Sequence, residues 1–263
     1  MKIRKGLIFR EFYLNRKKIR LSLIVYAVFI ILGLLVSLSA KIGNISKIKD
    51  PDLLLVLKPT LFYFFTIMNP LMLTYLFERT ESITADIKSG WLTFAATTPA
   101  SSAERSAAFC ISELISYIAA LLLSTANLLL FGTIDGRGFD LLTFEIILVM
   151  YFMSAASYTI QSIMSYRNKN AARGTLYGVI VLYSMNGAVV VAALRYIKKL
   201  PDKLGFDPAG DDAPANAAKL VVELMLSDAG KVLNVLSVIV PFATIALFIS
   251  VFFLMKKAFE RKG

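Results

Sequence analysis

Residues 106–132 read SAAFCISELISYIAALLLSTANLLLFG, and this stretch decides the class of the protein. Within it Glu113 is the only charged side chain. A helix needs about 20 consecutive and mostly apolar residues to cross the hydrocarbon core of a bilayer. The stretch therefore predicts a transmembrane α-helix, and it raises the question of how many more there are.

Similar apolar runs recur along the whole chain. They are continuous and not alternating, which favours helices over a membrane β-barrel. Hydrophobic residues make up 57% of the 263 residues, above the 45–50% that is usual for soluble domains. We therefore predict an all-α, polytopic membrane protein with six transmembrane helices in a single transmembrane domain, 1–263. The six spans lie at about 21–40, 53–77, 106–132, 139–164, 173–194 and 234–255.

The distribution of basic residues predicts the orientation. Segments 1–20, 78–105, 165–173 and 256–263 together hold 18 Lys and Arg, whereas the segments on the other side hold 10. The positive-inside rule places the more basic set in the cytoplasm. We therefore expect a multi-pass membrane protein with both termini in the cytoplasm. Residues 1–20 precede a run too long for a signal peptide, so we expect no cleavable signal.

Two extramembrane segments have distinct compositions. Residues 1–20 intersperse eight basic residues with apolar and aromatic ones, which is typical of a helix lying in the cytoplasmic interface. Residues 195–233 should form the largest outer loop. There a coil rich in Pro, Gly and Asp precedes a short helix, AKLVVELML, which is too short to span.

The composition excludes several kinds of chemistry. The chain has no histidine and one cysteine, Cys110, which removes most zinc sites and histidine-based acid–base catalysis. No P-loop motif is present, so the chain does not itself cradle ATP. The net charge of +11 lies at the membrane boundaries, so we expect no nucleic-acid partner. We predict a non-catalytic chain that holds no metal and no cofactor of its own.

Two carboxylates and one glycine pair stand out inside the spans. Glu113 and Glu145 could line a substrate path or a subunit interface, because charges in lipid usually face protein or water. Alternatively, each lies within about two turns of a boundary and reaches interfacial water, the interpretation we favour, since neither has an evident cationic partner. Gly174 and Gly178 form a G-x-x-x-G, a spacing that lets two helices approach closely, either between subunits or within one.

The cytoplasmic segment 78–105 is longer than a simple connection needs. Ile83, Ile87, Trp91 and Phe94 recur at helical spacings and would share one face of a helix. Gly90 interrupts this pattern and should mark a turn between two short helices.

The end of the same segment carries a second signal. Pro99 should stop the second short helix. Ser101 and Glu104 then have the spacing of a capping box, so the third membrane helix should begin near residue 102. Two interpretations compete: an aromatic face that settles on lipid, or a rigid helical plug for a cytosolic partner. We favour the plug.

The same residues carry a family resemblance. The stretch from Asp86 to Trp91 (DIKSGW), followed by Phe94, Thr97, Pro99 and Ser101, resembles the cytoplasmic loop of bacterial permeases in the type-2 ATP-binding-cassette exporter family. The closest subgroup is the short six-span permeases that include exporters of phenol-soluble modulins and related peptides. Residues 5–17 are similar to the opening of that subgroup.

The resemblance implies that 78–105 is a coupling helix between spans 2 and 3, seated in a separate ATP-binding-cassette ATPase subunit that would bind ATP and Mg²⁺. It also implies a second permease copy, as a homodimer or a related paralogue, and an amphipathic or hydrophobic cargo, with a toxin or antimicrobial peptide as first candidate. Alternatives from other classes are an intramembrane transferase and an ion-coupled carrier that uses Glu113 and Glu145. The residues expected to contact the ATPase are Glu81, Ile83, Asp86, Ile87, Ser89, Gly90, Trp91, Phe94 and Pro99.

Overall fold

The computed structural model describes residues 5–42, 51–91, 100–136, 138–204 and 214–260. These ranges are helical and contain no strand, which confirms the all-α prediction. The helices are α1 (Lys5–Leu14), α2 (Arg16–Ile42), α3 (Pro51–Leu73), the 3₁₀ helix η1 (Thr74–Phe77), α4 (Thr80–Lys88), α6 (Ser102–Asp135), α7 (Leu141–Asn168), α8 (Ala171–Leu204) and α9 (Pro214–Glu260).

Five segments of the described ranges are long and apolar enough to cross a membrane. They are Arg16–Ser39, Leu61–Lys88, Ser102–Asp135, Leu141–Asn168 and Asn234–Glu260. The remaining predicted span, 173–194, lies within α8, which is not among the five. The structure thus supports a membrane protein with five candidate spans, and the sixth stays a prediction.

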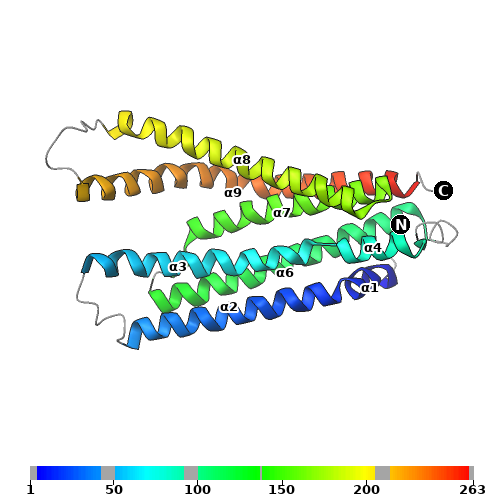
Figure 1. The fold of residues 1–263 in the computed structure, drawn as a ribbon, viewed down its shortest axis with the longest axis horizontal. Helices are drawn as coiled ribbons and strands as arrows, with labels where there is room; N and C mark the ends of the chain where they lie inside the picture. Colours follow the sequence, from blue (N-terminus) through cyan, green and yellow to red (C-terminus); the bar gives the residue numbers. More distant parts are fainter. Residues whose placement is uncertain (1–4, 43–50, 92–99, 137, 205–213, 261–263) are drawn as a thin grey trace.

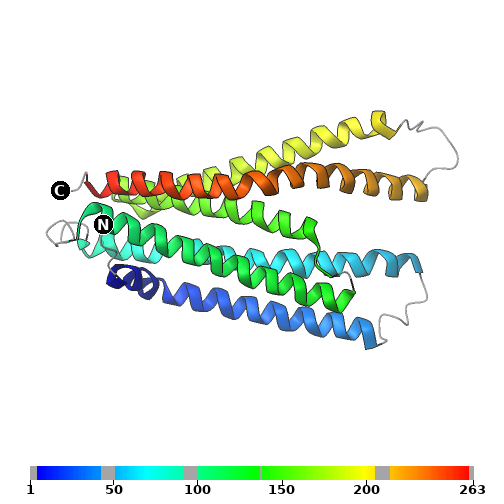
Figure 2. The same cartoon turned by 180° about the vertical axis from the view of Figure 1, so that it is seen from behind.

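The long helices lie side by side along the length of the molecule (Figures 1 and 2). One end of the bundle carries α1, α4, the α7–α8 turn and both chain termini. At the opposite end α2 ends and α3 begins, α6 ends and α7 begins, and α8 ends and α9 begins. This grouping agrees with the two sets of segments that the basic residues separate. We call the end that carries α1 and α4 the proximal end.

The N-terminal segment is two helices and not one. α1 ends at Leu14, and α2 begins at Arg16. Between them Asn15 is fully buried, and its side-chain nitrogen donates to the Glu11 carbonyl at 2.8 Å. An Asn that bonds the local backbone in this way competes with the regular helix. Phe9 is exposed on α1, as an interfacial helix would require.

The predicted outer loop 195–233 is largely helical. α8 extends to Leu204, and α9 begins at Pro214 and continues to Glu260. The expected separate short helix is therefore the first part of α9. Proline at a first helical position is favourable, because its missing N–H would have no partner there. Pro241 lies inside α9, as membrane helices tolerate.

Gly174 and Gly178 pack α8 against α7 within this chain. A Cβ at Gly174 would lie 1.7 Å from the Ser165 Oγ and 2.5 Å from the Gln161 carbonyl oxygen. The Ser157 hydroxyl donates to the Gly178 carbonyl at 2.8 Å. Of the two roles the G-x-x-x-G allowed, the structure shows close packing within one subunit.

Polar side chains also join helices in the middle of the bundle. The Asn69 side chain donates to the Asn127 side chain at 2.9 Å, linking α3 to α6, and both residues are buried. The Tyr151 hydroxyl on α7 donates to the Pro70 carbonyl at 3.1 Å. Such a bond between membrane helices contributes about 0.6 kcal/mol on average. These bonds therefore mainly determine how the helices align along their length and add little to the free energy of unfolding.

Candidate functional site

α4 is short, and the sequence defines where it ends. It runs from Thr80 to Lys88, and Gly90 follows with φ of 66°. That left-handed conformation is open to glycine and strained for most other residues. The predicted turn at Gly90 is therefore confirmed. The second short helix, with Phe94 and Pro99, falls in 92–99, outside the described residues.

The chain re-enters the bundle through the predicted capping box. The Glu104 backbone N–H donates to the Ser101 hydroxyl at 3.1 Å, and the Ser101 N–H donates to the Glu104 carboxylate at 3.0 Å. α6 accordingly begins at Ser102. This cap satisfies two backbone donors that a helix start otherwise leaves without partners.

The apolar face of α4 points into the bundle. Ile83 is 1% exposed and packs in one core cluster with Phe109, Tyr166 and Met255. Ile87 is partly buried against the same cluster. For Ile83 and Ile87 the structure shows packing against the bundle in place of a contact with lipid or with a partner. The helical spacing was right, but the partner is the chain itself.

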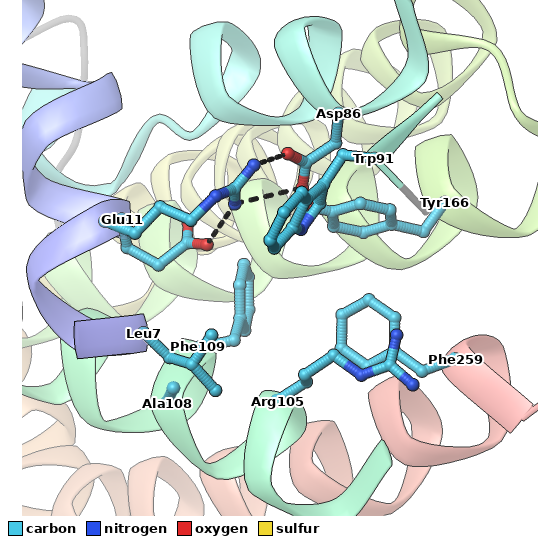
Figure 3. A pocket seen from close by; sticks show the side chains of 10 residues that line it. Leu7, Glu11, Asp86, Trp91, Arg105, Ala108, Phe109, Tyr166 and Phe259 are labelled. Atoms are coloured by element: carbon cyan, nitrogen blue, oxygen red, sulfur yellow. Dashed lines mark hydrogen bonds and ion pairs between the residues drawn. The ribbon is translucent and has the colours of Figure 1, made fainter. Parts of the chain in front are cut away.

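Asp86 is also engaged within the chain (Figure 3). Its carboxylate forms an ion pair with the Arg10 guanidinium of α1 and accepts a hydrogen bond from the Tyr166 hydroxyl of α7 at 2.9 Å. The predicted role of Asp86 as an outward contact is thus corrected. Asp86 ties α4 to the first helix of the chain and to the end of α7.

Arg10 holds a second predicted contact residue. Its guanidinium carbon lies 4.4 Å from the centre of the Trp91 ring, a distance at which a cation is attracted to the ring face. Burial lowers the pKa of Arg10, but the hydrogen bond and the charge of Asp86 outweigh burial and raise that pKa overall. Arg10 is therefore charged at any physiological pH, and it joins Trp91 to Asp86.

The Glu113 carboxylate has a cationic partner, Arg79, which the sequence interpretation missed. The Arg79 Nε donates to it at 2.7 Å, and both side chains are almost completely buried. Arg79 also donates to the Ser112 carbonyl at 3.1 Å and to the Ser116 hydroxyl at 2.8 Å. The expectation that Glu113 reaches interfacial water is therefore wrong. An arginine two residues after an apolar run was the available signal.

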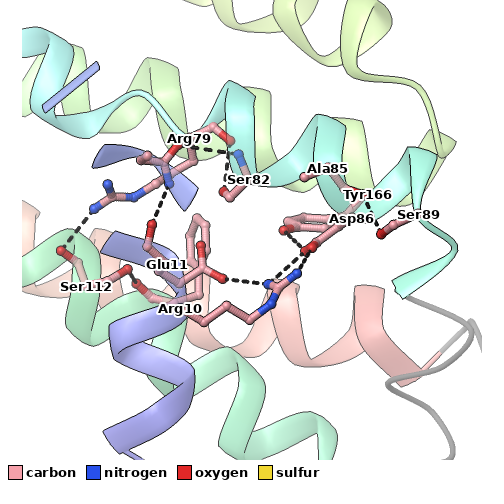
Figure 4. A network of polar contacts seen from close by, with 11 residues as sticks. Arg10, Glu11, Arg79, Ser82, Ala85, Asp86, Ser89, Ser112 and Tyr166 are labelled. Carbon is pink, nitrogen blue, oxygen red and sulfur yellow. Dashed lines mark hydrogen bonds and ion pairs between the residues drawn. The ribbon is translucent and has the colours of Figure 1, made fainter. Parts of the chain in front are cut away.

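Glu11 of α1 (Figure 4) and Asn15, between α1 and α2, complete this arrangement. The Asn15 side-chain oxygen accepts from the Ser82 backbone N–H at 3.4 Å. Glu11 is buried, and this burial raises the pKa of its carboxyl group, with a further increase from the negative charge of Asp86. We call Arg10, Glu11, Arg79, Asp86, Glu113 and Tyr166 the proximal polar cluster.

A small cavity of about 20 Å³ lies within the cluster. Leu7, Arg10, Glu11, Asp86 and Tyr166 contribute to its walls (Figure 3). Room for a single water needs about 10–15 Å³ by this kind of measure. The cavity can therefore hold one or two waters and is too small for a substrate.

Glu145 lies far from the cluster. It is 2% exposed, near the start of α7, whereas Tyr166 stands at the other end of the same helix. Their separation of 21 residues corresponds to about 31 Å along a helix. The structure therefore does not bring Glu113 and Glu145 together, and it buries Glu145 as well.

The outward side of α4 and its turn offers a different set of residues. Lys88, Ser89 and Gly90 are exposed, and Glu81 is partly exposed. Glu81 and Lys88 line a shallow surface depression together with Thr84. Of the predicted contact residues within the described ranges, Ser89 and Gly90 are exposed, and Glu81, Ile87 and Trp91 are partly exposed, whereas Ile83 and Asp86 are buried.

A movement of α4 can be passed to the rest of the bundle, because the charged groups around this short helix are paired and buried. A displacement of α4 acts directly on α1 through Arg10 and on α7 through Tyr166, and the preceding Arg79 acts on α6 through Glu113. Comparisons of this chain with protein-family models, with curated proteins and with solved structures gave no match.

Proposed function

We propose that this chain is the membrane-embedded permease subunit of an ATP-driven exporter, moved by a separate cytosolic ATPase. The observation that carries the proposal is the anchoring of α4. Asp86 joins this short helix at the proximal end to α1 and α7, and Arg79, the residue just before the helix, is paired with Glu113 of α6. The DIKSGW motif that resembles the coupling segment of such permeases ends this helix.

The physical argument concerns force. A partner that moves on binding ATP can rearrange a bundle only through a segment that does not yield locally. Breaking a buried ion pair by removing one partner costs about 3–5 kcal/mol. The two pairs that involve α4 and its approach, Arg10–Asp86 and Arg79–Glu113, therefore make it part of the bundle.

The contact surface proposed for the ATPase differs from the one expected from the sequence. It is the exposed side formed by Glu81, Lys88, Ser89 and Gly90, because Ile83 and Asp86 face inward. The inward residues would transmit the motion and the outward ones would receive it. The helix would then move as a rigid body, with the ATPase bound on one side and the bundle attached on the other.

The assembly would contain two permease copies, identical or paralogous, with ATP and Mg²⁺ on the ATPase subunits. The cargo would be an amphipathic peptide of the toxin or antimicrobial type, released from a cell membrane in which both termini face the cytoplasm. The ion-coupled carrier has less support, because Glu113 is paired with Arg79 and lies remote from Glu145.

The test is co-purification. The tagged chain is expressed together with its neighbouring genes, and we expect an ATPase subunit to remain bound in mild detergent. Lys88→Glu with Ser89→Arg should release that subunit, whereas Lys257→Glu, an exposed basic residue of α9 at the same end, should not. If no ATPase co-purifies with the wild type, or if the double variant retains it fully, the proposal fails.

A further inference from the structure

Three carboxylates of the proximal polar cluster share two guanidinium groups. Glu113 is paired with Arg79 at 2.7 Å. Asp86 is paired with Arg10, whose Nη1 also lies 3.5 Å from the Glu11 Oε1. Asp86 on α4 and Glu11 on α1 thus face the same cation from two helices (Figure 4).

Asp86 has the stronger hold on this cation. Both of its carboxylate oxygens accept from the Arg10 guanidinium, and it also accepts from the Tyr166 hydroxyl. Glu11 approaches Arg10 with Oε1 only, and its Oε2 is buried without a hydrogen-bond partner in the described part of the chain. Burying an ionised carboxylate that is not fully paired is so costly that such a group takes up a proton instead.

The other charged and titratable groups around Glu11 are engaged elsewhere or are themselves negative. Arg79 attracts it but is paired with Glu113, and both Glu113 and Asp86 add negative charge. On α7 the Tyr166 hydroxyl is bonded to Asp86. The cations farther around α1 have other contacts: Arg105 of α6 lines the same cavity but lies over the Phe259 ring, Arg16 of α2 lies over the Tyr13 ring, and Lys18 of α2 is paired with Glu78.

The small cavity of the cluster gives Glu11 a neighbour that can exchange a proton. Glu11, Arg10, Asp86 and Trp91 all contribute to its walls (Figure 3). Its volume of about 20 Å³ is enough for one or two waters. A water there can accept a proton from the Glu11 carboxyl group and can return it.

We propose that Glu11 is a proton-binding site that controls how firmly α4 is attached to α1. With the proton bound, Glu11 is neutral, and Arg10 is left to Asp86 and to the Trp91 ring. When Glu11 releases its proton to water, its carboxylate competes with Asp86 for Arg10 and repels Asp86. Arg10 then turns toward Glu11, and the contact between α1 and α4 weakens. This switch lies within one chain and does not depend on the exporter assignment.

The direction of the pH dependence follows from the surroundings of Glu11. Burial and the negative charge of Asp86 raise the pKa of the Glu11 carboxyl group above its ordinary value of 4.5. The attachment of α4 to α1 is therefore complete below pH 4.5, and it weakens as pH rises through the raised pKa.

The test follows the proton and the attachment together in the purified full-length chain in micelles, as pH is raised from below 4.5. The infrared band of protonated carboxyl groups reports the proton. The fluorescence of Trp91, the only tryptophan, reports whether Arg10 still lies 4.4 Å from the centre of its ring. We expect both signals to change with one midpoint. Glu11→Gln should abolish the fluorescence change and the matching infrared change, whereas Glu260→Gln, an exposed carboxylate at the same end, should retain both.

A second variant tests the competition for Arg10. Asp86→Asn removes the competing charge and leaves Arg10 to Glu11, so the midpoint of the infrared change should fall by about 1–3 pH units, the effect of a close opposite charge. Three results would overturn the proposal: wild-type Trp91 fluorescence that does not change with pH, a change that persists in Glu11→Gln, or an unaltered midpoint in folded Asp86→Asn. If Asp86→Asn does not fold, the wild type and Glu11→Gln still decide.

Discussion

Removing Arg79 should destabilise the protein more than any other single change of charge. Arg79→Met retains much of the apolar volume but leaves the Glu113 carboxylate buried without its partner. Such a loss costs about 3–5 kcal/mol. The exposed pair Lys256–Glu260, at 3.7 Å and one turn apart in α9, is the matched control. Lys256→Met should cost only about 0.3–0.5 kcal/mol.

Substituting Glu113, alone and together with Arg79, separates the interaction within the pair from the interactions of each residue with its other neighbours. In Glu113→Met, Arg79 loses its counter-charge but keeps its hydrogen bonds to the Ser112 carbonyl and the Ser116 hydroxyl. Arg79→Met with Glu113→Met removes both charges of this pair, and replacing a buried pair by apolar residues is often nearly neutral. The double variant should therefore be more stable than either single variant, with an interaction term of about 2–3 kcal/mol.

The assay is reversible unfolding in mixed micelles, in which the free energy of unfolding is followed as denaturing detergent is added. Melting temperature gives an independent measure, since 3–5 kcal/mol corresponds to a decrease of about 6–20 °C for a chain of this size. Additive effects of Arg79→Met and Glu113→Met would refute the reasoning. A single-variant cost below that of Lys256→Met would refute it as well.

Four further changes test other parts of the structure. Burial raises the pKa of Glu11 above the ordinary value of 4.5. The protonated Glu11 therefore stabilises the fold fully below pH 4.5, and this stabilisation is lost as pH rises through the pKa of the folded state. Glu11→Gln should raise the melting temperature at pH 8 but not at pH 4, and an equal gain at both would contradict this. Gly90→Ala should cost about 1 kcal/mol through its positive φ, and Gly90→Asn less, as compared by melting temperature. Gly174→Ala should separate α7 from α8 and lower protein yield in the membrane, whereas Gly187→Ala, with open space around it, should be neutral or stabilising; equal yields would count against the close packing. Ser101→Ala should cost about 1 kcal/mol by loss of the cap, and unchanged stability to detergent unfolding would show that the cap contributes nothing.

Much of the fold follows from local sequence, because its signals act over a few residues. Apolar runs predicted the long helices, Gly90 predicted a turn, and the spacing of Ser101 and Glu104 predicted the start of α6. Each depends on backbone geometry that a segment determines for itself. The end of α1 also has a local cause, because the Asn15 side chain bonds the backbone of Glu11, but the sequence had predicted one helix over residues 1–20.

The candidate site depends on contacts that no local pattern contains. Arg10 and Asp86 are 76 positions apart, and Arg79 and Glu113 are 34 apart. The spacing of Ile83 and Ile87 correctly predicted that they share a face of α4, but it could not tell whether that face meets lipid, a partner or the bundle. Only the arrangement of α6, α7 and α9 around α4 decides this, and that arrangement buries Ile83.

The order of synthesis gives the Arg10–Asp86–Tyr166 contact a further consequence. α1 leaves the ribosome first, but its partner on α4 appears only after two spans have been made, and Tyr166 appears last. At 5–20 residues per second, the 80 positions between Asp86 and Tyr166 take about 4–16 s. During that interval α1 has no complete docking site. α1 is therefore made well before the groups on α4 and α7 that hold it in place.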